Sequence, residues 1–495
     1  MEYRKDWIAR WASYHPEKLA VRESGTGRSL SYGDLQELSA RAASFLHTKL
    51  GLQKGSRIAV LADFCLEYIV LFAAAQKLGI ILVPLNYRLT GREIAYMLDN
   101  SQPDLLLTDE KYLPLLNGQK ALEEIRHIFK PSTFSEVLET FESKDYPAEE
   151  LGADHPLFIL YTSGTTGFPK GAIYTHGMAF WNSINTATRL DITSQDHTLV
   201  CMPPFHTGGW NVFITPFLHH GASFTLLPKF DASQVLQLLE EERATLFMAV
   251  PTMLKMMLEA PEFERLKLES TRYFIVGGEA LPLPTIEAWH AKGVLIRQGY
   301  GLTEAGPNIT SLNHEDATRK KGSIGKPNFY VEYQVMDDEG KQVEKGQRGE
   351  LWLSGPMITP GYWQNEEATR AAIEERWFKT GDVVREDEED FLYIVDRKKN
   401  MYISGGENVY PAEVEQYLLL HPSIEEAAVV GVPDEQWGET GKAFVTLKEG
   451  SMLGEQEIVS WCRKGLAKYK VPRHIHFMSE LPKNESGKIV RKLLK

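Results

Sequence analysis

The chain has 495 residues, of which 43% are hydrophobic and 24% are charged, so it has enough apolar material for large cores without disulfide or metal support. Lysine and arginine number 54 against 67 aspartates and glutamates, and a net charge of −13 argues against a general nucleic-acid binder. Three cysteines, at Cys65, Cys201 and Cys462, stand too far apart for a disulfide framework or a Cys-x-x-Cys metal site.

The N-terminus is charged at once and has no apolar signal-peptide core. The most apolar stretch, 69–85, is interrupted by polar residues and a glycine too early for a transmembrane segment of about 20 residues. We therefore expect a cytoplasmic protein without a transmembrane segment. Net charge alone leaves peripheral membrane contact and a homodimer open.

Helical and strand patterns alternate over most of the chain. Ser31 is a helix N-cap candidate with Asp34 three residues on, and apolar residues then follow at helical spacing. Asp231 is a second such cap. Short apolar runs predict buried strands at 58–61, 80–83, 105–107, 223–227, 246–250 and 273–276, with a buried helix at 66–78. This alternation predicts an α/β fold with parallel-rich sheets covered by helices.

The texture of the sequence changes at about residue 320. Short strands at 333–336, 349–353 and 391–395 are separated by turns rich in glycine and aspartate, which predicts a small antiparallel, β-barrel-like part or sheet at 320–396. After Asp396 a compact α+β pattern follows, in which Pro411 opens a helix and 427–430 and 442–447 are strands. We therefore predict a large N-terminal domain, 1–396, and a small C-terminal α+β domain, 397–495.

The segment Tyr161-Thr-Ser-Gly-Thr-Thr-Gly-Phe-Pro-Lys-Gly171 follows an apolar strand pattern. Its glycines let the backbone turn its N–H groups onto an anion, while four hydroxyls and Lys170 add donors and a positive charge. Two residues separate Gly167 from Lys170, so the string is no Walker loop and a P-loop kinase or ATPase is disfavoured. The pattern suits a polyphosphate ligand.

This string resembles the signature of the adenylate-forming enzymes, which include acyl- and aryl-CoA synthetases, luciferases and peptide-synthetase adenylation domains. Further strings resemble the family's motifs in the family's order, and they cover nearly the whole chain. They are 203–209, 299–304, 349–355, 380–382, 396–399, 404–411 and 482–488. The chain is most similar to a bacterial-type fatty acyl-CoA synthetase.

The resemblance implies two half-reactions. The acid attacks the α-phosphate of ATP to give an acyl-adenylate and pyrophosphate, and the thiol of CoA then takes the acyl group and releases AMP. The implied cofactor is Mg²⁺, with ATP and CoA as co-substrates. In the family, Lys488 bridges the acid and the α-phosphate, Glu304 binds the metal and Thr303 lies near the α-phosphate. These three are the candidate catalytic residues.

The resemblance assigns the other ligands by position. Asp382 and Arg397 reach the ribose, Tyr300 lies against the adenine, and the full nucleotide-binding set is Thr162, Ser163, Gly164, Thr165, Thr166, Gly167, Lys170, Gly278, Glu279, Ala280, Tyr300, Asp382 and Arg397. The acyl pocket is assigned to His206, Gly209, Trp210, Gly277 and Gly301, although Trp210 suits a core position equally well. Gly405 and Gly406 line the CoA path, and Lys399 occupies the hinge position.

The acid is the least determined part of the function. The inferred pocket is rich in glycine and apolar residues, and no lysine or arginine in its segments is placed to pair with a second carboxylate. This favours a medium- or long-chain fatty acid, with an aryl acid as the alternative. A ligase that loads an acyl carrier protein is a further alternative. A catalytically dead relative is disfavoured, because Lys488, Glu304 and Asp382 are all present.

Overall fold

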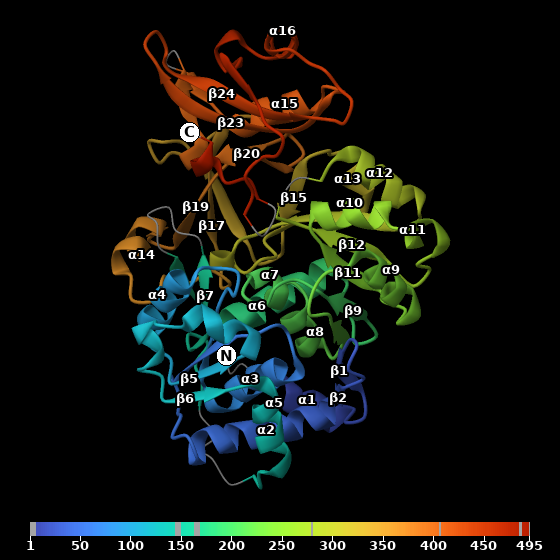
Figure 1. The fold of residues 1–495 in the computed structure, drawn as a ribbon, viewed down its shortest axis with the longest axis vertical. Coiled ribbons are helices and arrows are strands. Elements are labelled where there is room, and N and C mark those ends of the chain that lie inside the picture. Colours follow the sequence, from blue (N-terminus) through green and yellow to red (C-terminus); the bar gives the residue numbers. More distant parts are fainter. Residues whose placement is uncertain are drawn as a thin grey trace. The chain divides into compact units, whose positions relative to one another are not determined.

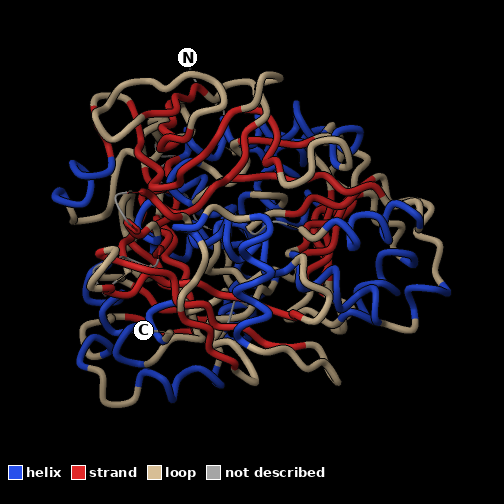
Figure 2. Tube along the Cα trace, turned by 90° about the horizontal axis from the view of Figure 1, so that it is seen from above, coloured by secondary structure: helices blue, strands red, loops and turns tan. Residues whose placement is uncertain are grey.

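The structure is a computed structural model, and it describes residues 6–143, 150–162, 169–278, 281–404, 407–484 and 488–494. The chain divides into two compact units, which are described separately (Figure 1). Unit 1 comprises Met1–Glu332 and Leu353–Phe378, and unit 2 comprises Tyr333–Trp352 and Lys379–Lys495. The strand segments, drawn red in Figure 2, run between helices drawn blue.

Two sheets form unit 1. The first is parallel except for its last pair, β7 and β8. In order across the sheet its strands are β6 (His127–Phe129), β5 (Leu105–Thr108), β3 (Arg57–Leu61), β4 (Ile81–Pro84), β7 (Pro156–Thr162) and β8 (Lys170–Thr175).

The second sheet of unit 1 has parallel pairing from β13 to β1 and antiparallel pairs at both ends. In order its strands are β15 (Ser323–Pro327), β14 (Thr310–Leu312), β13 (Leu295–Tyr300), β12 (Tyr273–Val276), β11 (Leu246–Ala249), β9 (His197–Val200), β10 (Ser223–Leu226), β1 (Leu19–Glu23) and β2 (Ser29–Ser31). The parallel-rich sheets that the sequence predicts are confirmed.

Helices and a two-residue strand complete unit 1. They are α1 (Trp7–Tyr14), α2 (Tyr32–Thr48), α3 (Leu66–Leu78), α4 (Gly91–Ser101), α5 (Pro131–Thr140), α6 (His176–Leu190), α7 (Thr207–Asn211), α8 (Ile214–His220), α9 (Ala232–Glu241), α10 (Pro251–Glu259), α11 (Glu262–Arg265), α12 (Leu283–Ala291), α13 (His314–Ala317), α14 (Glu366–Ala372) and β18 (Ile373–Glu374).

The core of unit 1 is built around α3. Every residue of this helix is buried, because it is mostly apolar and packs within one hydrophobic cluster with side chains of both sheets, while its buried Glu67 and Lys77 form ion pairs. Phe72 of α3 stacks on Phe158 of β7 at a centroid distance of 5.9 Å. Short interactions fix where the surface helices begin: the Ser31 hydroxyl and the Asp34 carboxylate form the predicted capping box of α2, and Asp231 accepts from Gln234 N at 2.8 Å to cap α9.

Unit 2 contains two sheets, which come from different parts of the sequence. The predicted strand-rich segment supplies β16 (Glu332–Met336), β17 (Arg348–Ser354), β19 (Trp377–Glu386) and β20 (Leu392–Arg397), hydrogen-bonded in that order. The C-terminal segment supplies the second sheet, β22 (Glu407–Val409), β21 (Tyr402–Ser404), β24 (Gly438–Leu447) and β23 (Ile424–Asp434), with β25 (His474–Phe477) on β24. Helices α15 (Pro411–Leu419) and α16 (Glu455–Gly465) share its hydrophobic core.

Two strands of the C-terminal sheet are longer than the sequence predicts. The predicted strands 427–430 and 442–447 are parts of one long antiparallel hairpin, β23–β24, which continues through Pro433. The Asp434 carboxylate accepts from the backbone N–H groups of Gln436 and Trp437, both at 2.9 Å, and so closes the turn. Polar residues near a hairpin tip give no apolar pattern, so the sequence underestimates the length of these strands.

Candidate active site

Glu304 lies at the carboxyl end of β13, where an open parallel sheet usually presents its ligand site. The chain turns tightly there, because a Cβ on Gly301 would lie 2.0 Å from the carbonyl oxygen of Pro307. A short 3₁₀ turn, Thr303–Ala305, carries Glu304, and its carbonyl accepts from Thr359 N at 2.7 Å. Glu304 is 9% exposed, so its carboxylate needs hydrogen-bonding partners.

Two hydroxyl groups supply such partners, and both bind the same carboxylate oxygen. The Tyr362 hydroxyl donates to Oε1 of Glu304 at 3.0 Å, and Thr162 Oγ1, at the end of β7, donates to that oxygen at 3.3 Å. Lys170, at the start of β8, lies with its Nζ 5.3 Å from the centre of the Tyr362 ring. The structure thus brings together Thr162, Lys170 and Glu304, three of the residues that the sequence predicts.

Burial, and secondarily the negative charge and the hydrogen bond of Glu304, raise the pKa of Tyr362 above its ordinary value. The phenol therefore stays protonated at neutral pH and remains a hydrogen-bond donor to the carboxylate. Lys170 supplies the positive charge beside it. The site has one carboxylate, two hydroxyls and one ammonium group, which suits a phosphate and its cation.

The donor set fits Mg²⁺ held jointly by protein and nucleotide. Mg²⁺ prefers oxygen ligands and is usually bound through one or two carboxylates together with substrate phosphates and waters. Glu304 offers such a carboxylate, and neither hydroxyl bond uses its Oε2. Within the described ranges no three His, Cys, Asp or Glu side chains gather as a metal cluster.

The predicted adenine-side residues follow neighbouring parallel strands. Gly277 and Gly278 follow β12, and Tyr300 ends β13, which pairs with it. A Cβ on Gly277 would lie 3.2 Å from the carbonyl oxygen of Gly299, and Gly278 has φ +91°, so both positions favour glycine. Glu279 and Ala280 lie outside the described residues, as do Ser163, Gly164, Thr165, Thr166 and Gly167.

The predicted acyl-pocket residues lie near α7. His206 precedes that helix, and its ring lies 4.7 Å from that of Phe205. A Cβ on Gly209 would lie 2.4 Å from the carbonyl oxygen of Pro203, so glycine is required for close packing. Trp210 is fully buried against aromatic rings of α3 and β7, and its Nε1 donates to the carbonyl of Pro204 at 2.9 Å. This is a core environment, and the pocket role of Trp210 stays a prediction.

In unit 2, Asp382 and Arg397 face each other across the antiparallel pair β19–β20. Arg397 Nε lies 2.6 Å from Asp382 Oδ1, and Asp382 N donates to the hydroxyl of Thr380 at 3.0 Å. Asp382 is 3% exposed, whereas the Arg397 side chain is half exposed. The Asp382 carboxylate is thus buried beside a half-exposed guanidinium, and the ribose role of this pair stays a prediction.

Lys488 of unit 2 is hydrogen-bonded through its backbone to Asn484. Its N–H donates to Oδ1 of Asn484 at 2.9 Å, and Asn484 N donates to the carbonyl of Lys488 at 2.8 Å. The residue is exposed. Lys399 lies in the 3₁₀ turn Lys398–Asn400 between β20 and β21, and burial, followed by Arg397 and other cations, lowers its pKa. Gly405 and Gly406 lie outside the described residues.

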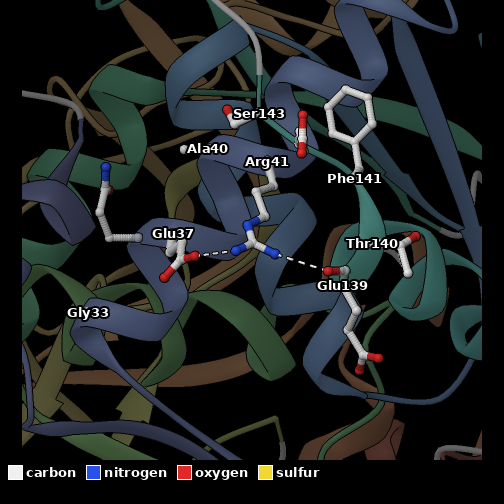
Figure 3. A pocket seen from close by; sticks show the side chains of 10 residues that line it. Gly33, Glu37, Ala40, Arg41, Glu139, Thr140, Phe141 and Ser143 are labelled. Carbon is white, nitrogen blue, oxygen red and sulfur yellow. Dashed lines mark hydrogen bonds and ion pairs between the residues drawn. The ribbon is translucent and has the colours of Figure 1, made fainter.

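A large surface pocket lies elsewhere in unit 1. It encloses about 510 Å³ between α2 and the end of α5, and it contains none of the predicted site residues. Arg41 spans it, forming an ion pair with Glu37 and donating to the carbonyl of Glu139 at 3.3 Å (Figure 3). The candidate site is thus defined by converging polar side chains and not by the size of a cavity.

Sequence reasoning did not identify Tyr362 or Thr359. The segment 359–363 runs along β8: Ile173 N donates to the carbonyl of Gly361 at 3.0 Å, and Thr359 Oγ1 donates to the carbonyl of Ile173 at 2.7 Å. The available signal was the string Gly361-Tyr-Trp363, in which a glycine precedes two aromatic residues. Only the fold reveals that this string lies beside Glu304.

Comparison with known proteins identifies the family. Residues 8–363 match the family described as AMP-binding enzyme, and residues 413–488 match the AMP-binding enzyme C-terminal domain. The long-chain-fatty-acid–CoA ligase FadD13 of Mycobacterium tuberculosis is 37% identical over 494 residues, 99% of this chain and 97% of that protein. A feruloyl-CoA synthase of Amycolatopsis sp. is 36% identical over 485 residues, 98% of this chain and 97% of that protein.

A solved structure agrees with these relatives. The O-succinylbenzoate coenzyme A synthetase of Bacillus subtilis, in complex with ATP and magnesium ion, matches with a TM-score of 0.87 at 33% identity, covering 99% of each chain. This match supports the fold class that the sequence predicts, a large N-terminal α/β part with a small C-terminal α+β part. No described helix has both the length and the apolar character needed to cross a membrane. The chain belongs to the AMP-binding enzyme family and is an acid–CoA ligase, that is, an acyl-CoA synthetase.

Proposed function

We propose that the protein activates a medium- or long-chain fatty acid with ATP, through an acyl-adenylate, and transfers the acyl group to CoA. The observation that carries this proposal is the convergence of Thr162 at the end of β7, Lys170 at the start of β8 and Glu304 in the turn after β13. A carboxylate is a poor acyl donor until its oxygen is converted into a good leaving group. AMP is such a leaving group, and phosphoryl chemistry of this kind needs the charge stabilisation that these residues offer.

The chain's own residues divide the work by chemistry. Lys170 binds phosphate oxygens, and Glu304, which accepts from the Thr162 hydroxyl, holds Mg²⁺, which neutralises phosphate charge when bound. Asp382 accepts hydrogen bonds from ribose hydroxyls, with Arg397 beside it. Lys488 stabilises the negative charge that develops as the carboxylate attacks the α-phosphate. In the thioester step the nucleophile is the thiol of CoA. Burial raises the pKa of the chain's described cysteine thiols, so they are poor nucleophiles.

The fatty acid is proposed from the apolar environment of the inferred acyl pocket. Gly208 would carry a Cβ 3.2 Å from Cε of Met248, and Phe205 lies beside His206, so apolar groups surround this segment. The FadD13 relative is named for long-chain fatty acids. An aryl acid is the second candidate, because the feruloyl-CoA synthase relative is almost equally similar. We further propose cytoplasmic location.

A panel of acids tests the substrate directly. Pyrophosphate release is measured with straight-chain acids of increasing length and with ferulic, indoleacetic and dicarboxylic acids, each with and without CoA. Each added methylene contributes up to about 0.8 kcal/mol until the pocket is full, so kcat/KM is expected to rise from C4 to C10. A dicarboxylic or amino acid as best substrate contradicts the proposal. An aryl acid as best substrate supports the second candidate. Acyl transfer to a carrier protein but not to CoA would mean that a carrier protein is the acyl acceptor.

A further inference from the structure

We propose that Tyr362 is a positioning residue for the reaction. Its hydroxyl fixes the orientation of the Glu304 carboxylate toward the divalent cation, and its ring holds the Lys170 ammonium near the same nucleotide phosphates. This inference rests on the proposed function, in which Glu304 holds Mg²⁺ and Lys170 binds phosphate. It adds Tyr362, which the sequence did not predict as a site residue, and this residue sets the positions of both Glu304 and Lys170.

The hydrogen bonds of Glu304 give Tyr362 the larger share in orienting the carboxylate. The phenol-to-carboxylate distance is 3.0 Å, shorter than the 3.3 Å of the Thr162 bond. Both bonds end on Oε1, so the carboxylate plane is fixed from one side while Oε2 takes part in neither. A carboxylate that is fixed in this way loses less rotational freedom when it binds a cation.

The ring of Tyr362 contacts the second charged group of the site, the ammonium of Lys170. Lys170 Nζ lies 5.3 Å from the ring centre, within the range of a cation–π contact. Tyr362 therefore contacts an anion through its hydroxyl and a cation through its ring. One side chain sets the spacing between the carboxylate and the ammonium, and a polyphosphate with its metal ion needs both charges at a fixed separation.

The backbone of Tyr362 is rigid enough for this role. It bridges Ala172 of β8, its N–H donates to Thr369 Oγ1 at 2.9 Å, and Trp363 N donates to the carbonyl of Gly171 at 2.7 Å. Gly361 has φ +144°, and a Cβ there would lie 2.5 Å from Cγ2 of Thr369. The chain before Tyr362 thus requires glycine, and the tyrosine is tied to the strand that begins with Lys170.

The contribution of the Tyr362 hydroxyl to metal binding is measured as a change in metal affinity, without turnover of the enzyme. Binding of Mn²⁺ to the full-length protein is followed by electron paramagnetic resonance in the presence of α,β-methylene-ATP, which the enzyme cannot cleave. Tyr362→Phe keeps the ring and removes the hydroxyl, and it is expected to weaken Mn²⁺ binding about tenfold. Nucleotide binding without metal should stay within about twofold. Tyr362→Leu also removes the cation–π contact and should weaken metal-free nucleotide binding by about threefold more.

Tyr112→Phe is a matched control, because the Tyr112 hydroxyl also donates to a carboxylate, Asp63 Oδ1, at 2.8 Å. It should leave Mn²⁺ binding unchanged. Unchanged Mn²⁺ binding in Tyr362→Phe, alongside at least a tenfold loss in Glu304→Gln, overturns this inference and leaves the proposed function standing. A lowered melting temperature with unchanged Mn²⁺ affinity would mark Tyr362 as a packing residue and likewise overturns the inference. Unchanged Mn²⁺ binding in Glu304→Gln would show that Glu304 does not hold the metal, which overturns this inference together with that one role in the proposed function.

Discussion

Lys488 is the residue whose proposed role gives the clearest split between the two half-reactions. Its backbone N–H donates to the side chain of Asn484, and the residue is exposed. Lys488→Ala should lower pyrophosphate release by about 10² or more, the effect of losing one charge-stabilising donor. Thioester formation from supplied acyl-adenylate should change much less, because that step needs no attack on phosphate. Equal losses in the two assays, or no loss in either, would contradict the role of Lys488.

His219 predicts how stability depends on pH. Its ring stacks on Trp7 at 4.3 Å, and burial, with a smaller effect of His220, lowers its pKa to about 3. The unfolded chain therefore binds the proton more tightly, so stability is unaffected above about pH 6.5 and is lost as the pH falls toward 3. From pH 7.5 to pH 5 this site costs about 2 kcal/mol of stability.

Thermal melts at the two pH values check this effect. The fall in Tm on acidification should be about 2–4 °C smaller in His219→Gln than in the wild type. His474→Gln is the control, because His474 is exposed on β25. An identical pH dependence in His219→Gln and the wild type would mean that His219 is protonated without cost in the folded protein.

At the scale of elements, one partly buried ion pair holds the segment that carries Lys488. Arg491 Nη2 lies 2.8 and 2.7 Å from the two oxygens of Glu415 on α15, and Val429 N also donates to this carboxylate. Glu415 is 9% exposed, and burial raises its pKa. Because one side chain of the short segment 488–494 makes both contacts to α15, the pair sets where Lys488 lies on the C-terminal sheet.

Arg491→Met should therefore impair adenylation about tenfold through Lys488, and it should lower Tm, because an unpaired buried carboxylate remains. Adding Glu415→Gln removes that charge and should restore part of the Tm but not the adenylation rate. Pyrophosphate release and thermal melts measure the two effects. If the double variant recovers both, the ion pair matters only for stability and does not position Lys488.

The elements themselves were largely predictable from local patterns. The capping box at Ser31 and the mostly apolar run 66–78 each fix a helix through residues close in sequence. The hairpin β23–β24 was underestimated, because pairing between strands stabilises its polar tip although the tip lacks an apolar pattern. The predicted boundary at residue 396 stays a prediction.

At the scale of the whole molecule, the prediction concerns the link between the two sheets of unit 2. Asp396 is buried and accepts from Arg397 N, from Asn400 Nδ2 and from Ala412 N at the start of α15. The link is thus held firmly on both sides of Lys399. The family resemblance predicts that the C-terminal part turns about this residue between the half-reactions.

Lys399→Pro should leave one arrangement accessible, because proline fixes φ near −65° and restricts the residue before it. Single-turnover pyrophosphate release should stay within about tenfold of the wild type, since the first step requires no turning. Acyl-CoA formation from supplied adenylate should fall much further. Equal losses of both rates, with the circular dichroism spectrum unchanged, would indicate an enzyme that works in one arrangement.

By itself the sequence determined the family, the order of the elements and most candidate ligands. These signals lie in short strings, in which glycines and charged residues can be interpreted from their sequence neighbours alone. The contacts among Thr162, Lys170, Glu304 and Tyr362 were decided only by the tertiary structure. These residues lie up to 200 positions apart, and no local pattern encodes which strand ends meet. The same holds for Trp210, whose indole suits a pocket wall or a core equally well until its neighbours α3 and β7 bury it. Burial depends on what packs against a residue, and that is a property of the fold.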